Sequence, residues 1–344
     1  MSVLLWPSLA WPLADDLAQL QEQVYRHPVS SMADARQARD AAHGRGDASA
    51  ELQALRQLAL AAWVGDSLAQ EQAAVKQAQA LAERLGSAAG KAEMLVHQAL
   101  LNVEGGQGAE AARQLDAAEA IARGAALPRH LATVLLARTA LAYAEGRDAD
   151  AAAQFHLAHA TALACGDRFS QAWALIGLGN LDTDTRSGAE AFERGIHQFE
   201  AAVETLDSQT YPGMALSALN RIGYALASRD RHAEARPYLV RAVEAATQLG
   251  SPAELAYANL ALAQVEMHDG HYAAATQRLD AAAVRSGPEF FSLRLWLARA
   301  RLLSLQGAGG ASLQALRRAE EELKSQDAPP RCTPGWATWG MPTA

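Results

Sequence analysis

The stretch ALSALNRIGYALASRDRHAEARPYLVRAVEAATQLG, from Ala215 to Gly250, contains two helical segments separated by a short polar turn. The first segment carries a small residue, Gly223, near its middle, and the second places Ala235, Leu239 and Ala242 at positions i, i+4 and i+7. That spacing puts the three side chains on one helix face, where small residues let a neighbouring helix approach closely. The stretch therefore predicts a helical hairpin that buries one face.

The same hairpin recurs along the chain at a nearly constant interval, and its next copy is ELAYANLALAQVEMHDGHYAAATQRLDAA, from Glu254 to Ala282. A small residue lies in the middle of each first helix and serves as a ruler for the repeat: Ala99, Thr139, Gly179, Gly223, Ala263 and Ala300. The longest interval between rulers separates Gly179 from Gly223, and it contains an enlarged turn, Asp182 to Phe192. Self-similarity at a fixed period, here roughly 40 residues, predicts a stacked repeat array, which usually binds partners rather than performing chemistry.

The second helices share a pattern and an ending. Each carries a small residue followed four and seven positions later by apolar ones, as in the sets Ala111/Leu115/Ala118, Ala151/Phe155/Ala158 and Ala275/Leu279/Ala282. A glycine just beyond the last apolar position is a helix stop, and we expect this role for Gly86, Gly124, Gly166 and Gly250. Seven units result, the first around 51–86 and the last around 292–326, and a degenerate eighth pair from about residue 16 to 46 would cap the array.

Three segments follow from this pattern. Residues 1–50 form an N-terminal segment with degenerate capping helices, and residues 51–326 form the repeat array. Residues 327–344 contain four prolines and no period, so we expect an irregular tail there. The abrupt end of the pattern suggests a truncated or frame-shifted product.

Composition favours an all-α, soluble protein. Half of the residues are hydrophobic but only 6% are aromatic, and the prevalent Ala and Leu favour helix. The net charge of −8 argues against a surface for nucleic acid. Cys165 and Cys332 are too few for a disulfide framework, which fits a reducing, cytoplasmic compartment. The apolar N-terminus MSVLLWPSLAWPLADD lacks Lys and Arg and is shorter than the ~20 residues that span a bilayer, so we expect no membrane association.

The segments RIGYALASRDRHAEARPYLVRAVE and IGLGNLD resemble tetratricopeptide repeats, with Gly or Ala in the first helix and paired Ala positions in the second. The resemblance covers roughly residues 51–326 and implies a right-handed α-solenoid of about seven antiparallel helix pairs. The period is longer than that family's usual ~34 residues, as in long-unit variants of bacterial regulatory proteins. HEAT-type repeats share the length of ~40 residues, but their Pro and Asp/Arg pattern is not matched.

The array also resembles the N-terminal sensor arrays of bacterial diguanylate cyclases and histidine kinases. There, a helix such as ASLQALRRAEEELKS leads into the output domain, but no GGDEF-like sequence or kinase motif occurs in this chain. The resemblance implies that any such output domain has been lost or belongs to another protein.

Motifs for chemistry are weak. His156 and His159 are one helical turn apart, but no third metal ligand accompanies them. The turn that begins at Asp182 mismatches a calcium loop, because Arg186 occupies a ligand position. Nucleophile-elbow, Walker and HExxH sequences do not occur. We therefore expect no enzyme activity, no cofactor and no metal; an enzyme would need ionisable groups assembled in space.

The remaining candidate is the concave surface, which the first helices line in stacked helix pairs. Counting along the helical period from the ruler residue nominates Trp173, Asn180, Asn220, Tyr224, Tyr257, Gln264, Arg294 and Arg301. Amide, aromatic and Arg side chains suit a peptide, and the two arginines could pair with a carboxylate. The equivalent positions of earlier units are blander, with Val96, Leu100, Leu136 and Ala140.

Two functions follow as hypotheses. The first is a non-enzymatic scaffold that binds an extended or acidic segment of a partner protein in its concave groove. The alternative is a ligand-sensing module of a signalling protein whose output domain is missing. The sequence gives neither the identity of the ligand nor the oligomeric state.

Overall fold

A computed structural model describes residues 17, 20, 21, 24, 28–64, 67–184, 188–206, 211–283 and 289–325. These residues form helices joined by turns, and they contain no strand. The expected all-α solenoid is therefore confirmed. The predicted tail, 327–344, lies outside the described residues, as do most of the first 27.

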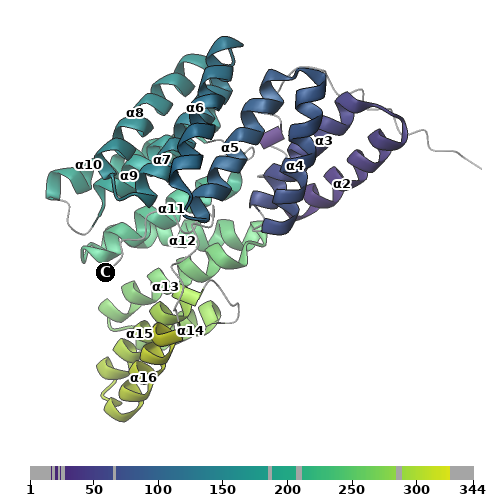
Figure 1. The fold of residues 1–344 in the computed structure, drawn as a ribbon. Helices are drawn as coiled ribbons and strands as arrows, with labels where there is room; N and C mark the ends of the chain where they lie inside the picture. The colour runs from purple at the N-terminus through teal and green to yellow at the C-terminus, as the bar shows by residue number, and fades with distance from the viewer. Residues whose placement is uncertain are drawn as a thin grey trace, which may run out of the picture.

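Seven antiparallel helix pairs follow one another along the chain, preceded by α2 (Pro28–Gly44), and together they curve into an open arc (Figure 1). The pairs are α3 (Ala48–Val64) with α4 (Leu68–Leu85), α5 (Ala88–Glu104) with α6 (Gly108–Gly124), α7 (Pro128–Ala144) with α8 (Asp148–Cys165), α9 (Arg168–Asp182) with α10 (Ala189–Thr205), α11 (Pro212–Ser228) with α12 (His232–Leu249), α13 (Pro252–His268) with α14 (Tyr272–Ala283), and α15 (Glu289–Leu305) with α16 (Gly309–Ser325). We call the first member of each pair the A helix and the second the B helix. Every ruler residue lies on an A helix, as predicted.

The B helices end largely as the glycines predict. Gly86, Gly166 and Gly250 follow α4, α8 and α12 with φ of 67°, 67° and 61°, in the left-handed region where glycine avoids a steric cost. The exception is α6, which includes Gly124 as its last residue, and Ala126 takes the left-handed φ of 52° instead. The turn is thus two residues later than Gly124.

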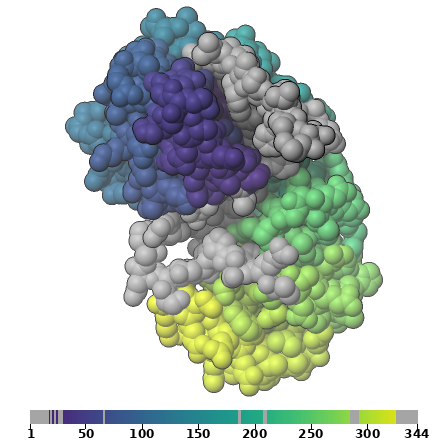
Figure 2. All heavy atoms as spheres, turned by 90° about the vertical axis from the view of Figure 1, so that its right-hand side faces the viewer, coloured from purple at the N-terminus to yellow at the C-terminus, as the bar shows by residue number. Residues whose placement is uncertain are grey.

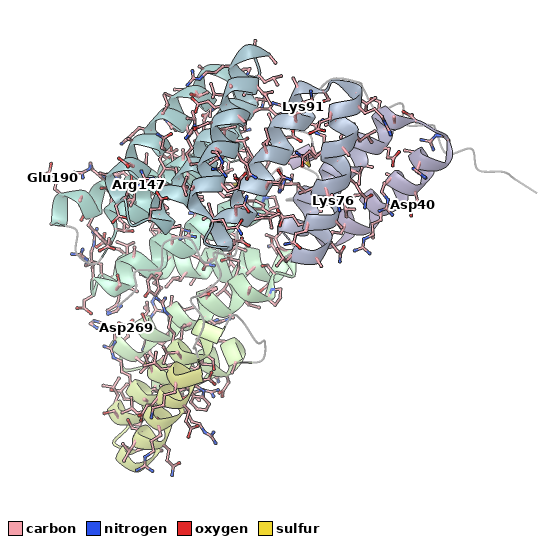
Figure 3. All side chains as sticks on the ribbon, viewed as in Figure 1. Asp40, Lys76, Lys91, Arg147, Glu190 and Asp269 are labelled. Atoms are coloured by element: carbon pink, nitrogen blue, oxygen red, sulfur yellow. The ribbon has the colours of Figure 1, made fainter. Side chains whose placement is uncertain are left out.

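One large side chain of each of the first six B helices fills the space between neighbouring A helices, and we call these six residues the knobs. The knobs are at most 2% exposed: Val75, Leu115, Phe155, Phe199, Leu239 and Leu279. Phe155 and Phe199 enclose α9 from both sides, because a Cβ on Gly177 would lie 2.1 Å from the Phe155 ring and a Cβ on Gly179 would lie 2.6 Å from the Phe199 ring. The small residues of the A helices therefore make room for the knobs, and charged side chains such as Lys76 and Arg147 point outward (Figure 3).

A buried ion-pair network joins the first three pairs. Arg56 on α3 donates from Nε and Nη2 to the two carboxylate oxygens of Glu93 on α5, each at 2.5 Å, and both side chains are buried. His130 on α7 lies 3.0 Å from the same carboxylate. Burial raises the pKa of Glu93, but the charges and hydrogen bonds of Arg56 and His130 outweigh it and hold the pKa well below its usual range. The network fixes the A helices in register.

The inner side of the arc is filled in its first half. Trp63 on α3 stacks on Trp173 on α9, with ring centroids 5.7 Å apart and 19° between the planes. Leu60, Val64 and Leu100 pack against the same apolar cluster. The bland positions of the early units, of which Val96, Leu136 and Ala140 are buried, are therefore packing positions. No helix in the described part of the chain is long and apolar enough to cross a membrane.

The packing of the knobs predicts a penalty for Gly179→Ala. The added methyl group would meet the Phe199 ring, so we expect a loss of about 1–3 kcal/mol in the free energy of unfolding, although alanine favours helix. Urea unfolding followed by circular dichroism measures this loss. The control is Gly124→Ala, whose methyl group would meet nothing within 4 Å. Equal stability of the two variants would contradict the knob packing.

The buried network predicts that replacing one member of the Arg56–Glu93 pair lowers the free energy of unfolding more than replacing both members does. Glu93→Leu leaves the Arg56 cation buried without its carboxylate, and we expect a loss of about 3–5 kcal/mol. The double variant Arg56→Met/Glu93→Leu should recover most of that loss in the same unfolding assay. Additive losses in the double variant would show that the pair is not coupled.

Candidate functional site

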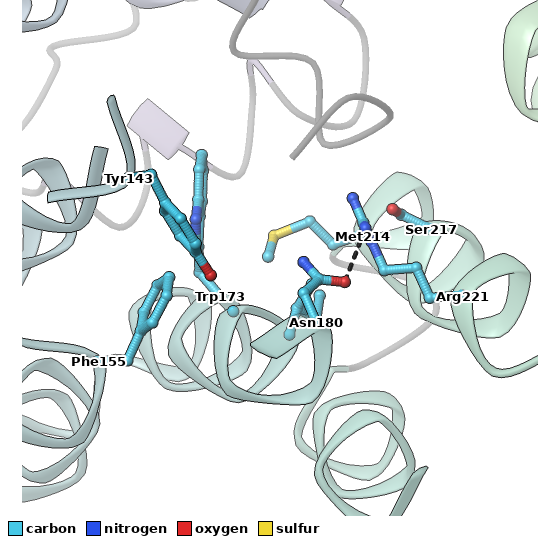
Figure 4. Close-up of a pocket in the computed structure, with 9 residues that line it drawn as sticks. Tyr143, Phe155, Trp173, Asn180, Met214, Ser217 and Arg221 are labelled. Carbon is cyan, nitrogen blue, oxygen red and sulfur yellow. Dashed lines mark hydrogen bonds between the residues drawn. The ribbon is translucent and has the colours of Figure 1, made fainter. Parts of the chain in front are cut away.

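A small cavity opens at the inner side of the arc, between α7, α8, α9 and α11, and we call it the central pocket (Figure 4). Its free volume is about 30 Å³, which suffices for about two water molecules. It is far below the roughly 300–1,000 Å³ of drug-sized ligand sites. The nine lining residues are Tyr143, Phe155, Trp173, Ile176, Gly177, Asn180, Met214, Ser217 and Arg221.

One wall of the central pocket is polar and bridges two helix pairs. Arg221 on α11 donates from Nη1 to Oδ1 of Asn180 on α9 at 2.8 Å. Arg221 is half-buried, and its side chain faces the cavity. Burial lowers the pKa of Arg221, and the nearby Glu254 carboxyl partly offsets this effect. An amide and a guanidinium thus lie side by side at the pocket.

The other wall is aromatic, and further aromatic rings pack against it. The Trp173 ring makes an edge contact with Phe169, with centroids 5.4 Å apart, in addition to its stack on Trp63. Phe155 is fully buried and contacts Tyr143 at 6.1 Å between centroids. Burial also raises the pKa of Tyr143, so its hydroxyl stays protonated at neutral pH. These contacts preorganise the apolar wall.

A buried amide–carboxyl pair lies next to the polar wall, between α11 and α13. Asn220 donates from Nδ2 to the backbone oxygen of Glu254 at 3.2 Å and also to Oε2 of its carboxyl group. Glu254 is 2% exposed and Asn220 is 8% exposed. Burial raises the pKa of Glu254 to about 7, although the hydrogen bond from Asn220 and the charge of Arg221 act in the opposite direction. Asn220 therefore connects the A helices α11 and α13. The sequence analysis had instead nominated it as a groove-lining residue.

A second group of predicted residues lies on three A helices, α11, α13 and α15. The guanidinium of Arg294 on α15 lies over the ring of Tyr224 on α11, 5.3 Å from its centroid, as in a cation–π contact. Tyr257 on α13 is half-buried; burial raises its pKa, and the charge of Arg294 opposes that shift. Tyr224, Tyr257 and Arg294 thus form an aromatic–cationic group next to the Asn220–Glu254 pair.

Gln264 and Arg301 are not part of either group. Gln264 is half-buried on α13, and Arg301 is exposed on α15. The positive charge of Arg301 contributes to the lowered pKa of His232, whose main cause is burial. Arg294 therefore lies next to Tyr224 and the charge of Arg301 acts on His232, and the joint binding of a carboxylate by the two arginines stays a prediction.

Of the nine lining residues, sequence reasoning nominated two, Trp173 and Asn180, and left seven off its list of site residues: Tyr143, Phe155, Ile176, Gly177, Met214, Ser217 and Arg221. Ser217 occupies the same repeat position as Trp173 and Tyr257, six residues before the ruler, so the count that nominated those two could have found it. Arg221 lies two residues before its ruler, Gly223, at a position that holds Gly177 in α9. Both residues line the pocket, so the repeat position two residues before the ruler reaches it from α9 and from α11.

Among the described residues, no group of three or more His, Cys, Asp or Glu side chains could hold a metal ion. At the enlarged turn, Asp182 pairs with Arg194 at 3.3 Å and Glu193 pairs with Arg231 at 2.5 Å. Asp182 and Glu193, the first and twelfth positions of the mismatched calcium loop, are therefore engaged in ion pairs.

No protein-family model matches the sequence, and no curated protein matches it significantly. Similar solved structures include the apo form of RapI, with a TM-score of 0.57 and 14% identity over 80% of this chain and 99% of that one. NprR in complex with its cognate peptide NprX has a TM-score of 0.53 and 13% identity, over 80% of each chain. At these identities the likeness is one of fold, and it supports a tetratricopeptide-like helical repeat. The resemblance to cyclase or kinase sensor arrays stays a prediction.

The raised pKa of Glu254 predicts a specific pH dependence of stability. The folded protein holds this proton up to about pH 7, whereas the unfolded chain releases it near pH 4.5, so stability falls as the pH rises between these values. Glu254→Gln removes this component, which amounts to about 3 kcal/mol. Urea unfolding at about pH 4.5 and about pH 8 should show that the variant gains stability over wild type only at the higher pH. An equal difference at both pH values would contradict the assignment.

Proposed function

We propose that the chain is a non-enzymatic regulatory protein that binds an extended segment of a peptide or partner protein in its concave groove, at the central pocket. The observation that carries the proposal is the pairing of Asn180 and Arg221 beside the fixed aromatic wall of Trp173. The fold supports it, because NprR, which shares this architecture, was crystallised with its cognate peptide.

The size of the central pocket favours a peptide over a metabolite. A free volume of about 30 Å³ accepts one small apolar group and cannot enclose a cofactor-sized molecule. An extended peptide would insert one side chain and leave its backbone along the groove. Asn180 offers both a donor and an acceptor, and Arg221 offers several donors, which suit the alternating C=O and N–H groups of a peptide backbone.

Regulation follows from the location of these groups on different helix pairs. Asn180 belongs to the α9/α10 pair and Arg221 to the α11/α12 pair. A ligand that bonds both would favour one relative orientation of the two pairs and shift the population of arc shapes accordingly. The Tyr224–Arg294 contact extends the row of polar groups toward the last pair, so a longer segment would gain cation and aromatic contacts there.

We further propose that this protein acts in the cytoplasm.

Selection from a random peptide library displayed on phage tests the proposal. Peptides that the wild-type protein enriches would be synthesised with a fluorescent label, and their Kd measured by fluorescence anisotropy. We expect Asn180→Ala and Arg221→Leu each to raise the Kd by about tenfold or more, because each removes a central polar contact.

The matched control is Arg113→Leu, which alters an exposed arginine on the B helix α6. It should leave the Kd unchanged, and circular dichroism would confirm the fold of all three variants. Enriched peptides that bind every variant equally well, or a library that yields no binder, would contradict a peptide site in this groove.

A further inference from the structure

The last helix pair ends in an apolar surface at positions that the earlier pairs bury. Five of the eleven exposed large apolar side chains of the described residues lie on α15 and α16. Four of them, Leu297, Leu313, Leu316 and Leu323, are 46%, 52%, 46% and 58% exposed, and we call them the end face. Both helices form one extremity of the molecule (yellow in Figure 2).

Positional equivalence shows that three of these leucines occupy core positions of the repeat. Leu316 follows its ruler, Ala300, by the same interval as the knob Leu239 follows Gly223, yet all six knobs are at most 2% exposed. Leu297 corresponds to Leu260, which is 4% exposed. Leu323 corresponds to Ala246, which is fully buried. In earlier pairs the A helix of the next pair covers these positions, as Gly177 of α9 covers Phe155.

The charges beside the end face match a second copy of the same helix. Arg317 has no ion-pair partner in the part of the chain that the structure describes. Glu320, three residues later, lies between Leu316 and Leu323 along the helix and pairs with Lys324 through one of its two carboxylate oxygens, at 2.6 Å. If two copies of α16 run antiparallel about a two-fold axis, Leu316 of one meets Leu323 of the other. The same axis brings Arg317 within reach of Glu320 of the second copy, so apolar and charged groups pair together.

The described surface of α2, near the other end of the array, differs from the end face. No large apolar side chain is exposed on the described part of α2, whose outward residues include Asp34, Gln37 and Asp40. A contact of the end face with this described surface of α2 would set its leucines against polar side chains. A two-fold arrangement instead covers the end faces of both copies at once.

We propose that this chain forms a homodimer through its end face, with α16 of the two copies antiparallel. The arrangement would leave both concave grooves open, because the central pocket belongs to α7–α11 and the end face to α15 and α16. Dimerisation would also bury Leu316, the knob equivalent, and the other leucines of the end face, which the array leaves without a following A helix.

Sedimentation equilibrium of the full chain over a micromolar concentration series tests the proposal. We expect a monomer–dimer equilibrium for the wild type and a dimer dissociation constant at least about tenfold higher for Leu316→Glu. The control is Leu163→Glu, which changes a 62% exposed leucine on α8 and should leave the equilibrium unchanged. Two results would overturn the proposal and point to another occupant: wild-type protein that stays monomeric, or equal dimer dissociation constants for the two variants.

A charge reversal tests the antiparallel arrangement itself. Arg317→Glu and Glu320→Arg should each weaken the dimer, because each places like charges together across the axis. Combining both substitutions in one chain restores opposite charges and should restore the dimer. Failure of the double variant to recover would overturn this geometry, while circular dichroism confirms that all variants remain helical.

Discussion

The structure depends on one repeated packing constraint: a B helix must bury a single large side chain between the A helices on either side of it. Phe155 shows the constraint most clearly, because α9 can approach it only where Gly177 lacks a side chain. Small residues four positions before and three positions after most knobs let the helices close around them, as Ala235 and Ala242 do around Leu239. The period, the arc and the last pair's exposed leucines all follow from this arrangement.

The same constraint determines which helix faces are left for the proposed ligand groove. Since the knobs occupy one face of the A helices, the remaining face is free to line the groove, and the arc brings these faces together. In the first half they meet, as the stack of Trp63 on Trp173 shows. From α9 onward they present polar groups, beginning with Asn180 and Arg221. Packing and recognition thus use opposite faces of the same helices.

The sequence predicted the fold far better than the site, and the reason is physical. Helix faces, knobs and turn positions depend on spacing within one repeat, so Leu115 and Gly250 could be assigned from local patterns. Arg221 and Asn220 are adjacent in sequence, yet one reaches the central pocket and the other is buried against Glu254. Consecutive residues of a helix point about 100° apart, and only the packing of the neighbouring pairs decides which direction is a cavity and which is core. The contact of Trp63 with Trp173 depends on the curvature of several repeats, which no local pattern encodes.

The central claim is that the groove at α9 and α11 holds an extended peptide. The most direct test is a crystal structure of the protein with a peptide selected for binding to it. We predict one peptide side chain in the central pocket against Trp173, with backbone hydrogen bonds to Asn180 and Arg221. A peptide bound on the outer B helices or on the end face, with the central pocket unoccupied, would contradict this account.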